Sequence, residues 1–388
     1  MGIRKIAFAT GTRADWGLLS PLARALAARD DCRVTVLATN MHLQPEYGDT
    51  IREVEADGLS DVRRVAMPQT GDTPLGTVGA MAGCMTAMAA ELDALKPDLI
   101  VILGDRFEML ATATAALMLR IPIVHIAGGE ISEGAIDDSI RHAITKMASL
   151  HLTATEPYRQ RVIAMGEEPE RVINTGAIGV SMFDDYEMDL SEVRRIVGFD
   201  IADGTLLVTY HPATLDDGDP AERFGELLKA LDRFPDHDVI ITYPNNDARG
   251  RVIIDMIEEY GRQNPQRVKV IPSLGHKRYL AALELVDAVV GNSSSGIVEV
   301  PSFGIPTVDI GIRQRGRVAA DSVIHCGDSA DEIETAIAKA LTDEYQSIAH
   351  FTVNPYYREG TLGLMVKAIA ETPLETLTVK KFHDVCPL

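Results

Sequence analysis

Short apolar runs alternate with longer stretches of helical periodicity along most of the chain. In the first half, continuous apolar runs predict strands over 5–10, 33–39, 98–104, 122–127, 151–155 and 171–176. Between them, apolar residues spaced three and four apart predict helices over 17–28, 77–95, 107–119, 135–148 and 156–165. Strands rich in Ile, Val and Leu on both faces, joined by helical crossovers, are typical of a parallel α/β sheet.

A turn-rich segment over 176–190 interrupts this pattern, and the alternation then restarts. Strands are predicted over 206–210, 238–242, 268–271, 288–291 and 306–310, and helices over 222–231, 248–262, 278–285, 296–303 and 331–341. One pattern that runs twice predicts an α/β protein with two doubly wound Rossmann-like domains facing a cleft, over 1–176 and 177–388. A last helix over 360–371 packs on one of the two, and the sequence leaves open which.

The composition narrows the function classes. With 37 Lys and Arg against 57 Asp and Glu in 388 residues, the formal charge is −20, which argues against binding to nucleic acid or to an anionic membrane. The cysteines lie far apart and form no CxxC pair, so we expect reduced thiols in a cytoplasmic protein; they are Cys32, Cys84, Cys326 and Cys386. The N-terminus lacks a signal-peptide pattern, and the uncharged stretch over 73–90 is expected to be mostly a buried helix.

Ligands in open α/β sheets bind beyond the carboxyl ends of the strands, so the loops there hold the candidate residues. The first loop, 11–17, contains neither a complete GxGxxG nor a Walker motif. Gly11 before a helix would let an anion approach the backbone, and Arg13 would add positive charge. An ordinary tight turn is the equally weighted alternative.

Carboxylates gather after two of the first-half strands. Asp105 is a candidate general base or acid, or else a cap of the helix that follows. Glu130, Glu133, Asp137 and Asp138 follow the next strand, where the aspartates would also favour a helix N-terminus. The spacing of the histidines His125, His142, His151 and His211 does not match a metal motif, so no metal site is expected.

The second half offers an anion site. His211 follows a strand, and Asn292, Ser293 and Ser294 precede a predicted helix whose N-terminus would cradle a diphosphate. Glu299, one turn on, would accept hydrogen bonds from ribose hydroxyls. The loop over 311–317 carries three arginines, Arg313, Arg315 and Arg317, which is unusual in so acidic a chain and favours anion binding.

Taken together, these motifs resemble the hydrolysing UDP-N-acetylglucosamine 2-epimerase family of sialic-acid and legionaminic-acid pathways, in consistent order from about residue 6 to 360. The resemblance implies a glycosyltransferase-B-like fold, a UDP-sugar substrate, and no metal or nicotinamide cofactor. It also implies elimination of UDP with loss of the C2 proton, followed by addition of water to the resulting glycal. The products would be N-acetylmannosamine and UDP.

The resemblance also assigns roles. Asp105 and Asp137 match catalytic acids, and His211 matches a histidine near the diphosphate and sugar. The positions expected to bind the UDP-sugar are Arg13, Asn292, Ser293, Ser294, Glu299, Arg313 and Arg317. Several relatives carry a catalytic Glu where this chain has Ala127, so we hypothesise that Glu130, or else Glu133, supplies the carboxylate.

Alternative functions stay open. The departure at Ala127 also fits a different substrate, the UDP-linked 2,4-diacetamido-2,4,6-trideoxy-glucose of legionaminic acid synthesis. A non-hydrolysing epimerase, a glycosyltransferase of the same fold and a UDP-sugar-binding regulator without activity are the further alternatives. A homo-oligomer, dimer or tetramer, is expected, and neither nucleic acid nor membrane is an expected partner.

Overall fold

The computed structural model describes residues 2–45, 48–68, 73–133, 135–180, 189–198, 204–212, 218–244 and 250–385. Cys386 and much of the turn-rich segment lie outside the described residues, as does the predicted start of the helix at Ala248. The chain forms two compact units. The first comprises the described residues of Met1–Glu130, Asp137–Ser181 and Arg358–Leu388, and the second those of Ile131–Ile136 and Met182–Tyr357.

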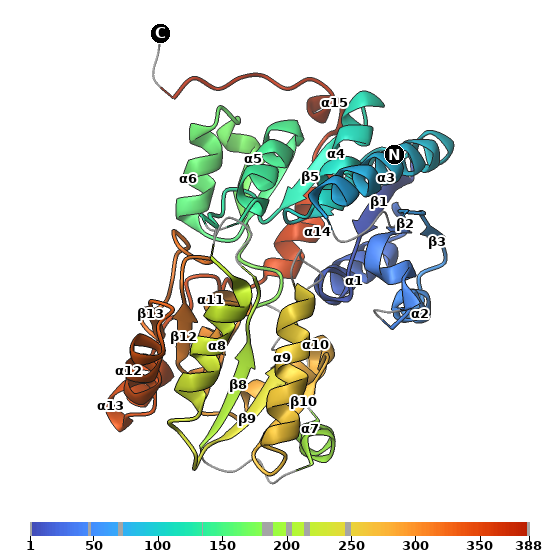
Figure 1. Cartoon of the computed structure of the whole chain (residues 1–388). Coiled ribbons are helices and arrows are strands. Elements are labelled where there is room, and N and C mark those ends of the chain that lie inside the picture. The colour runs from blue at the N-terminus through green and yellow to red at the C-terminus, as the bar shows by residue number, and fades with distance from the viewer. Residues whose placement is uncertain are drawn as a thin grey trace. The chain divides into compact units, whose positions relative to one another are not determined.

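The first unit contains a seven-stranded parallel sheet in the order β3-β2-β1-β4-β5-β6-β7 (Figure 1). Its strands are β1 (Arg4–Thr10), β2 (Cys32–Ala38), β3 (Val62–Arg64), β4 (Leu99–Leu103), β5 (Ile123–Ile126), β6 (Leu150–Thr153) and β7 (Val172–Asn174). Strand β1 pairs with β2 on one side and β4 on the other, so the strand order reverses there. Ligands of doubly wound folds bind at this reversal.

Helices cover both faces of this sheet. They are α1 (Arg13–Ala27), α2 (Ile51–Ala56), α3 (Pro74–Leu95), α4 (Phe107–Met118), α5 (Asp137–Met147), α6 (Glu156–Ala164), α14 (Thr361–Glu371) and α15 (Leu374–Leu377). Helices α3, α4 and α5 lie side by side and bury Met88, Met109 and Ile144 against strand residues such as Ile100. On the first unit, α14 packs against α1, which answers the question the sequence left open.

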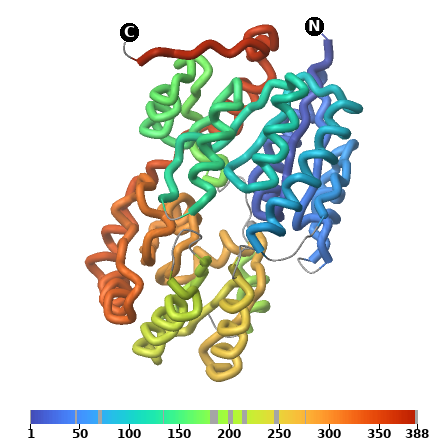
Figure 2. Tube along the Cα trace, turned by 45° about the horizontal axis from the view of Figure 1, so that its top comes forward, coloured from blue at the N-terminus to red at the C-terminus, as the bar shows by residue number. Residues whose placement is uncertain are grey.

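The end of the chain adds a second attachment to the first unit. Figure 2 shows the segment after α15 running beside α5 and α6. There the buried carboxylate of Glu167 accepts from Lys146 Nζ at 2.5 Å and Lys380 Nζ at 2.7 Å. His151 Nε2 lies 3.0 Å from Oε2 of the same Glu167 carboxylate, and the ring centre of Phe382 lies 5.1 Å from Lys146 Nζ. This cluster holds the segment after α15 on the first unit both by ion pairs and by packing.

The second unit repeats the topology. Its parallel sheet has the order β10-β9-β8-β11-β12-β13, so the reversal falls between β8 and β11. The strands are β8 (Thr205–Thr209), β9 (Asp238–Thr242), β10 (Val268–Ile271), β11 (Ala288–Gly291), β12 (Thr307–Ile310) and β13 (Val323–Cys326). The helices are α7 (Leu190–Val197), α8 (Pro220–Leu231), α9 (Gly250–Gln263), α10 (Gly275–Leu283), α11 (Ser295–Val298), α12 (Ala330–Ala340) and α13 (Asp343–His350). The two doubly wound sheets confirm the predicted fold class.

Two expectations about helices were wrong. The helix predicted over 296–303 is split, because α11 spans only four residues and a 3-10 turn, Val300–Phe303, follows it. Pro301 lacks the N–H that a continuing helix needs. Helix α3 buries one stripe of residues, while Leu75 and Val78 on another face are 81% and 62% exposed.

By length and composition, α3 is the one helix among the described residues that would be able to cross a membrane. The criterion is weak, because core helices of soluble proteins also meet it.

Candidate active site

Asp105 follows β4 at the strand reversal of the first unit, and a buried arginine of α5 holds it. Arg141 has only 1% of its side chain exposed, and its Nη2 forms an ion pair with the Asp105 carboxylate. Its Nη1 donates to the carbonyl oxygen of Glu130 at 3.1 Å and to Asp138 Oδ1 at 3.3 Å. Asp105 is therefore not the cap of α4; that position belongs to Arg106. One guanidinium links three of the segments that carry candidate acids.

His125 holds the backbone just before Asp105. Its Nε2 lies 2.8 Å from the carbonyl oxygen of Gly104, and because a carbonyl only accepts, Nε2 carries the proton. Its Nδ1 lies 3.1 Å from Thr145 Oγ1. Burial lowers the pKa of His125 to about 3, so the ring is neutral. As the sequence indicated, His125 is a buried, hydrogen-bonded structural histidine; its effect is to fix the turn that presents Asp105.

The remaining first-unit acids differ in exposure. Glu130 is 7% exposed, and Asp137, the first residue of α5, is half-buried. Glu133 is exposed and lies in the short segment that belongs to the second unit. Of the two acids that the sequence offers in place of the one absent at Ala127, Glu130 is thus the buried one and Glu133 the exposed one.

The backbone around Ala127 is tightly constrained. Ala127 has a φ of +66°, a left-handed conformation that non-glycine residues rarely adopt. At Gly129, with a φ of +80°, a Cβ atom would lie 2.6 Å from the carbonyl oxygen of Tyr158. These constraints fix the path of the chain into Glu130.

The first loop differs from its expected form, because α1 already begins at Arg13. Thr12 caps the helix in a reciprocal pair with Asp15, and Arg13 Nε forms an ion pair with Glu53 at 2.9 Å. The space left by Gly11 is filled by Glu108, whose Oε1 would lie 2.3 Å from a Cβ there. A carboxylate in that space makes the loop a poorer anion site than its sequence indicated.

Burial raises the pKa of Asp15 to about 6. The positive charge of Arg106 acts to lower this pKa, and the negative charge of Glu108 acts to raise it. Asp15 and Glu108 thus place two further carboxyl groups beside the first loop.

In the second unit, Asn292 joins the ends of two strands. Its side-chain Oδ1 accepts from the backbone N–H of His211 at 2.7 Å, and its Nδ2 donates to the carbonyl oxygen of His211 at 2.8 Å. The preceding Gly291 has a φ of +144°, and a Cβ there would lie 1.9 Å from the carbonyl oxygen of Thr209. The amide of Asn292 is therefore engaged in positioning His211, which is 5% exposed.

The backbone of Asn292 also anchors the arginine-rich loop. Its carbonyl oxygen accepts from Arg313 Nη1 at 3.0 Å and from Gln314 Nε2 at 2.9 Å. Arg317 Nη2 donates to Ser132 Oγ at 3.2 Å within the same unit. Sequence reasoning missed Gln314, because a glutamine between two arginines carries no signal of its own.

The helix that follows Asn292, Ser293 and Ser294 is shorter than expected, because α11 spans only four residues. Backbone N–H groups of Gly296, Val298 and Glu299 already donate to serine carbonyls within the turn, and Ser295 Oγ donates to Tyr279. Ser293 and Ser294 are half-buried and precede the four-residue helix α11. The segment therefore presents serine side chains at the start of a helix of only four residues. Glu299 is half-buried at the end of α11.

In the described part of the chain, no group of three or more His, Cys, Asp or Glu side chains is arranged to hold a metal ion.

The two doubly wound parallel sheets, with carboxylates after β4 and β5 and polar turns after β8 and β11, define a two-domain α/β protein of glycosyltransferase-B-like fold. The sequence profile described as UDP-N-acetylglucosamine 2-epimerase matches residues 24–370. The chain belongs to this family.

Relatives match over most of their lengths. A Campylobacter jejuni protein, GDP/UDP-N,N'-diacetylbacillosamine 2-epimerase (hydrolyzing), is 33% identical and is covered over 100% of its length and 99% of this chain. A Legionella pneumophila UDP-N,N'-diacetylbacillosamine 2-epimerase (hydrolyzing) is 35% identical, covering 87% of this chain and 89% of its own. A Neisseria meningitidis UDP-N-acetylglucosamine 2-epimerase is 30% identical, and the match covers 95% of this chain and 94% of the relative.

Solved structures agree in fold. The crystal structure of UDP-GlcNAc 2-epimerase from Neisseria meningitidis bound to UDP-GlcNAc has a TM-score of 0.79 at 16% identity, covering 95% of this chain and 100% of its own. A putative UDP-N-acetylglucosamine 2-epimerase from Listeria monocytogenes has a TM-score of 0.76 at 17% identity, covering 95% and 96%. At these identities the likeness shows the fold alone.

Proposed function

We propose that this protein is a hydrolysing 2-epimerase of a UDP-linked N-acetylated amino sugar. The observation that carries the proposal is the buried Arg141, which holds Asp105 and the main chain of Glu130 at the strand ends of a chain in the 2-epimerase family. Acids fixed at these positions suit the movement of a proton to and from a sugar carbon.

The relatives favour one substrate over the other. The relative at 35% identity is named for UDP-N,N'-diacetylbacillosamine and the relative at 33% for GDP/UDP-N,N'-diacetylbacillosamine. N,N'-diacetylbacillosamine is the trivial name of 2,4-diacetamido-2,4,6-trideoxy-glucose. The relative named for UDP-N-acetylglucosamine is 30% identical. We therefore place the diacetamido sugar first and UDP-N-acetylglucosamine, which the sequence motifs put first, second.

The proposed reaction has two steps. In the first, Asp105 or Asp137 removes the C2 proton while the C1–O bond breaks and UDP leaves, which gives a glycal. In the second, water adds its oxygen to C1 as Glu130 takes a proton from it, and a proton returns to C2 on the opposite face. The sum is UDP-sugar plus water to UDP plus the free C2-epimerised sugar.

The second unit is proposed to bind UDP. Ser293, Ser294, Arg313 and Arg317 would contact the diphosphate, and Glu299 the ribose, because cations and hydroxyl groups match these ligands. His211, held by Asn292, would stabilise the leaving phosphate. Asn292 itself acts as a positioning residue. Arg13 would contribute once its ion pair with Glu53 opens.

The deciding experiment incubates the protein in D2O with UDP-N,N'-diacetylbacillosamine or with UDP-N-acetylglucosamine, without any acceptor, and follows each by NMR. We expect UDP and a free C2-epimerised sugar with deuterium at C2. An epimer still attached to UDP would show the non-hydrolysing reaction instead. Turnover only after an acceptor is added would show a transferase, and binding without turnover of either sugar would show a regulator.

We expect Glu130→Gln to lower kcat by about 100-fold, because the variant keeps the shape of the side chain but cannot take the proton from water. Glu133→Gln is the matched control, since Glu133 is exposed, and its kcat should stay at the wild-type value. Release of UDP measures both. Equal rates for Glu130→Gln and wild type would remove Glu130 from the reaction.

We also propose a cytoplasmic homo-oligomer. The three cysteines that the structure describes, Cys32, Cys84 and Cys326, are free thiols, as suits a reducing compartment. The exposed apolar face of α3, defined by Leu75, Val78, Ala82 and Met85, supports association with a second copy.

A further inference from the structure

The chain leaves the first unit for six residues between two of the candidate acids. Glu130 ends one stretch of the first unit and Asp137 begins the next, while the described residues of Ile131–Ile136 are part of the second unit. Arg141 Nη1 donates to the carbonyl oxygen of Glu130 at 3.1 Å. Six extended residues span at most about 22 Å, so this connection has little slack. The contacts that hold the segment over 131–136 therefore bear directly on the position of Glu130.

The arginine-rich loop over 311–317 holds this segment within the second unit. Arg317 Nη2 donates to Ser132 Oγ at 3.2 Å. The backbone N–H of Glu133 donates to the carbonyl oxygen of Arg315 at 3.3 Å. The first contact uses two side chains and the second uses main chain alone, so a substitution of Ser132 that deletes its hydroxyl removes the first and leaves the second.

Packing adds to these hydrogen bonds. Gly316 has a φ of +87°, and a Cβ atom there would lie 2.6 Å from Cγ2 of Ile131. Ser132 is 5% exposed, and its carbonyl oxygen accepts from the backbone N–H of Ala135 at 2.9 Å. Because the Ser132 side chain is buried, water competes little for its hydroxyl, and the hydrogen bond from a charged guanidinium group is a strong one.

The other end of the loop is anchored at the proposed diphosphate site. Arg313 Nη1 and Gln314 Nε2 donate to the carbonyl oxygen of Asn292 at 3.0 Å and 2.9 Å. The side chain of Asn292 in turn holds the backbone of His211. One short loop thus contacts both the residues proposed to bind the diphosphate and the segment that follows Glu130.

We propose that Ser132 is a positioning residue that links diphosphate binding to the catalytic acid Glu130. This inference rests on the proposed function, in which Arg317 contacts the diphosphate and Glu130 takes a proton from water. A guanidinium presents several N–H donors in one plane, so Arg317 can bind a phosphate oxygen and Ser132 Oγ at the same time. A bound diphosphate then fixes Arg317, and Ser132 carries this constraint into the main chain that leads to Glu130.

A purely structural contact is the competing hypothesis. In that case the hydrogen bond between Ser132 and Arg317 stabilises the second unit whether or not UDP is bound. Its loss would lower the unfolding temperature without a specific effect on turnover. The two hypotheses differ in the effect of UDP on the segment over 131–136 and in the effect of the Ser132 hydroxyl on kcat.

The first measurement is steady-state release of UDP by Ser132→Ala. We expect kcat to fall by at least about tenfold while the Kd for UDP stays within about twofold of the wild type, because the diphosphate contacts remain and the position of the acid changes. Isothermal titration calorimetry with UDP alone measures the Kd. An unchanged kcat would overturn the proposal. A loss of UDP affinity in place of a loss of kcat would overturn it too, because Ser132 would then act in binding.

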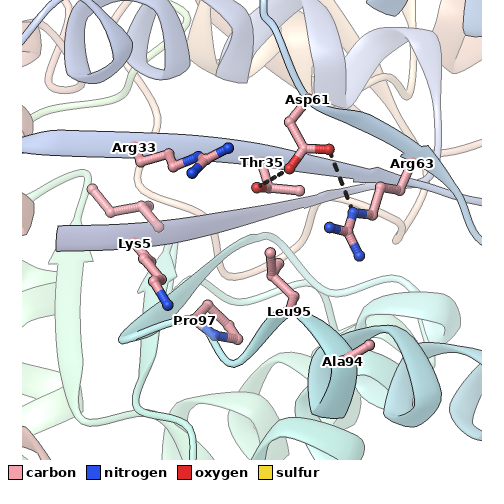
Figure 3. Close-up of a pocket in the computed structure, with 9 residues that line it drawn as sticks. Lys5, Arg33, Thr35, Asp61, Arg63, Ala94, Leu95 and Pro97 are labelled. Carbon is pink, nitrogen blue, oxygen red and sulfur yellow. Dashed lines mark hydrogen bonds and ion pairs between the residues drawn. The ribbon is translucent and has the colours of Figure 1, made fainter. Parts of the chain in front are cut away.

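Thr35→Val is the matched control. Thr35 is 3% exposed and its Oγ1 donates to Asp61 at 2.8 Å, so this variant also removes one hydrogen bond of a buried hydroxyl. Figure 3 shows Thr35 and Asp61 at a cavity lined by residues near the amino ends of β1 and β2, whereas the candidate acids follow the carboxyl ends of their strands. We expect Thr35→Val to keep the wild-type kcat. An equal loss of kcat in both variants would favour the structural contact.

The second measurement is hydrogen exchange of the whole chain with and without UDP. In the wild type, we expect UDP to slow exchange both in the loop over 311–317 and in a peptide that contains Ser132 and Glu133. In Ser132→Ala, the effect should be confined to the loop. UDP that slows exchange in the loop alone in the wild type would overturn the link and leave the UDP site in place. A wild type that binds no UDP would contradict the proposed function itself, and this inference with it.

Discussion

At the scale of single residues, Arg141 is the side chain on which the candidate acids depend. It is buried, it pairs with Asp105, and it binds the main chain of Glu130 and the side chain of Asp138. A guanidinium presents several donors in one rigid plane, so it can hold these groups in fixed relative positions, which an ammonium group cannot do. We infer that Arg141 is a positioning residue.

Replacing Arg141 by Lys keeps the positive charge but removes the planar guanidinium group with its several hydrogen-bond donors. We expect kcat to fall by about 100-fold with little change in KM, because a displacement of the acid by about 1 Å is enough for such a loss. Arg159→Lys, a half-buried arginine of α6, is the control for general loss of stability. Steady-state release of UDP measures both variants. A larger effect on KM than on kcat would instead place Arg141 in substrate binding.

At the scale of elements, α3 has more apolar surface than its own unit covers. Leu75, Val78, Ala82 and Met85 recur at intervals of three and four residues, so they form one stripe along the helix. Leu75 is 81% exposed. A stripe of this kind on a water-exposed helix is typical of an interface between subunits.

Val78→Glu should therefore shift the protein from oligomer to monomer, because a carboxylate buried in an apolar interface loses its hydration. Val353→Glu is the matched control, since Val353 is 85% exposed and lies outside α3. Size-exclusion chromatography with light scattering measures the mass of each. Equal masses for Val78→Glu and wild type would place the interface elsewhere.

The elements also show what the sequence could and could not predict. Buried strands such as β4 and β9 were predicted to within a residue or two, because a short apolar run bounded by turns rarely forms anything except a buried strand. The edge strand β3 was missed, because its sequence Val-Arg-Arg has no apolar run. The break in the helix at Pro301 was missed although proline gave the signal.

Long-range pairing limits the prediction of the site. Sequence order placed Asp105 and His211 after their strands, but the partners that hold them are Arg141 and Asn292, 36 and 81 residues away. Such pairs follow from the sheet order and not from local pattern. One local signal was available: Arg141 lies three residues after Asp138 on one helix, a spacing at which two side chains can form an ion pair.

At the scale of the whole molecule, acidity bears on both substrate and stability. The proposed substrate, a UDP-sugar, is an anion, so the overall charge of −20 would oppose its approach, and the proposed contacts Arg313 and Arg317 would have to supply the attraction locally. Buried ionisable groups also couple folding to pH. Burial lowers the pKa of His42 to about 4 and that of His125 to about 3, so both favour folding above their unfolded pKa near 6.5, and this contribution declines as the pH falls.

Glu167 gives a sharper pH prediction. Burial alone would raise its pKa, but hydrogen bonds from His151, Lys146 and Lys380 lower it from 4.5 to about 2. A lowered carboxyl pKa contributes stability above the unfolded pKa, about 3 kcal/mol here, and the contribution is lost as the pH falls towards 2. Glu167→Gln should therefore destabilise the protein most at pH 7, and the gap should narrow between pH 5 and pH 3.

Urea unfolding of Glu167→Gln and wild type at several pH values measures this gap. Glu170→Gln, an exposed glutamate of the same region, is the control and should be close to neutral at every pH. A gap that does not change with pH would mean that shape, and not charge, holds the tail to the first unit.

The path of the chain constrains how this protein can recombine with its homologues. The chain leaves the first unit after Glu130, returns at Asp137, leaves again near residue 181 and returns at Arg358. A crossover between two genes at the boundary expected from the sequence, after residue 176, would join α1 of one parent to α14 of the other. A chimera that keeps each unit from a single parent has to exchange 358–388 together with 1–130 and 137–181, and has to keep 131–136 with 182–357.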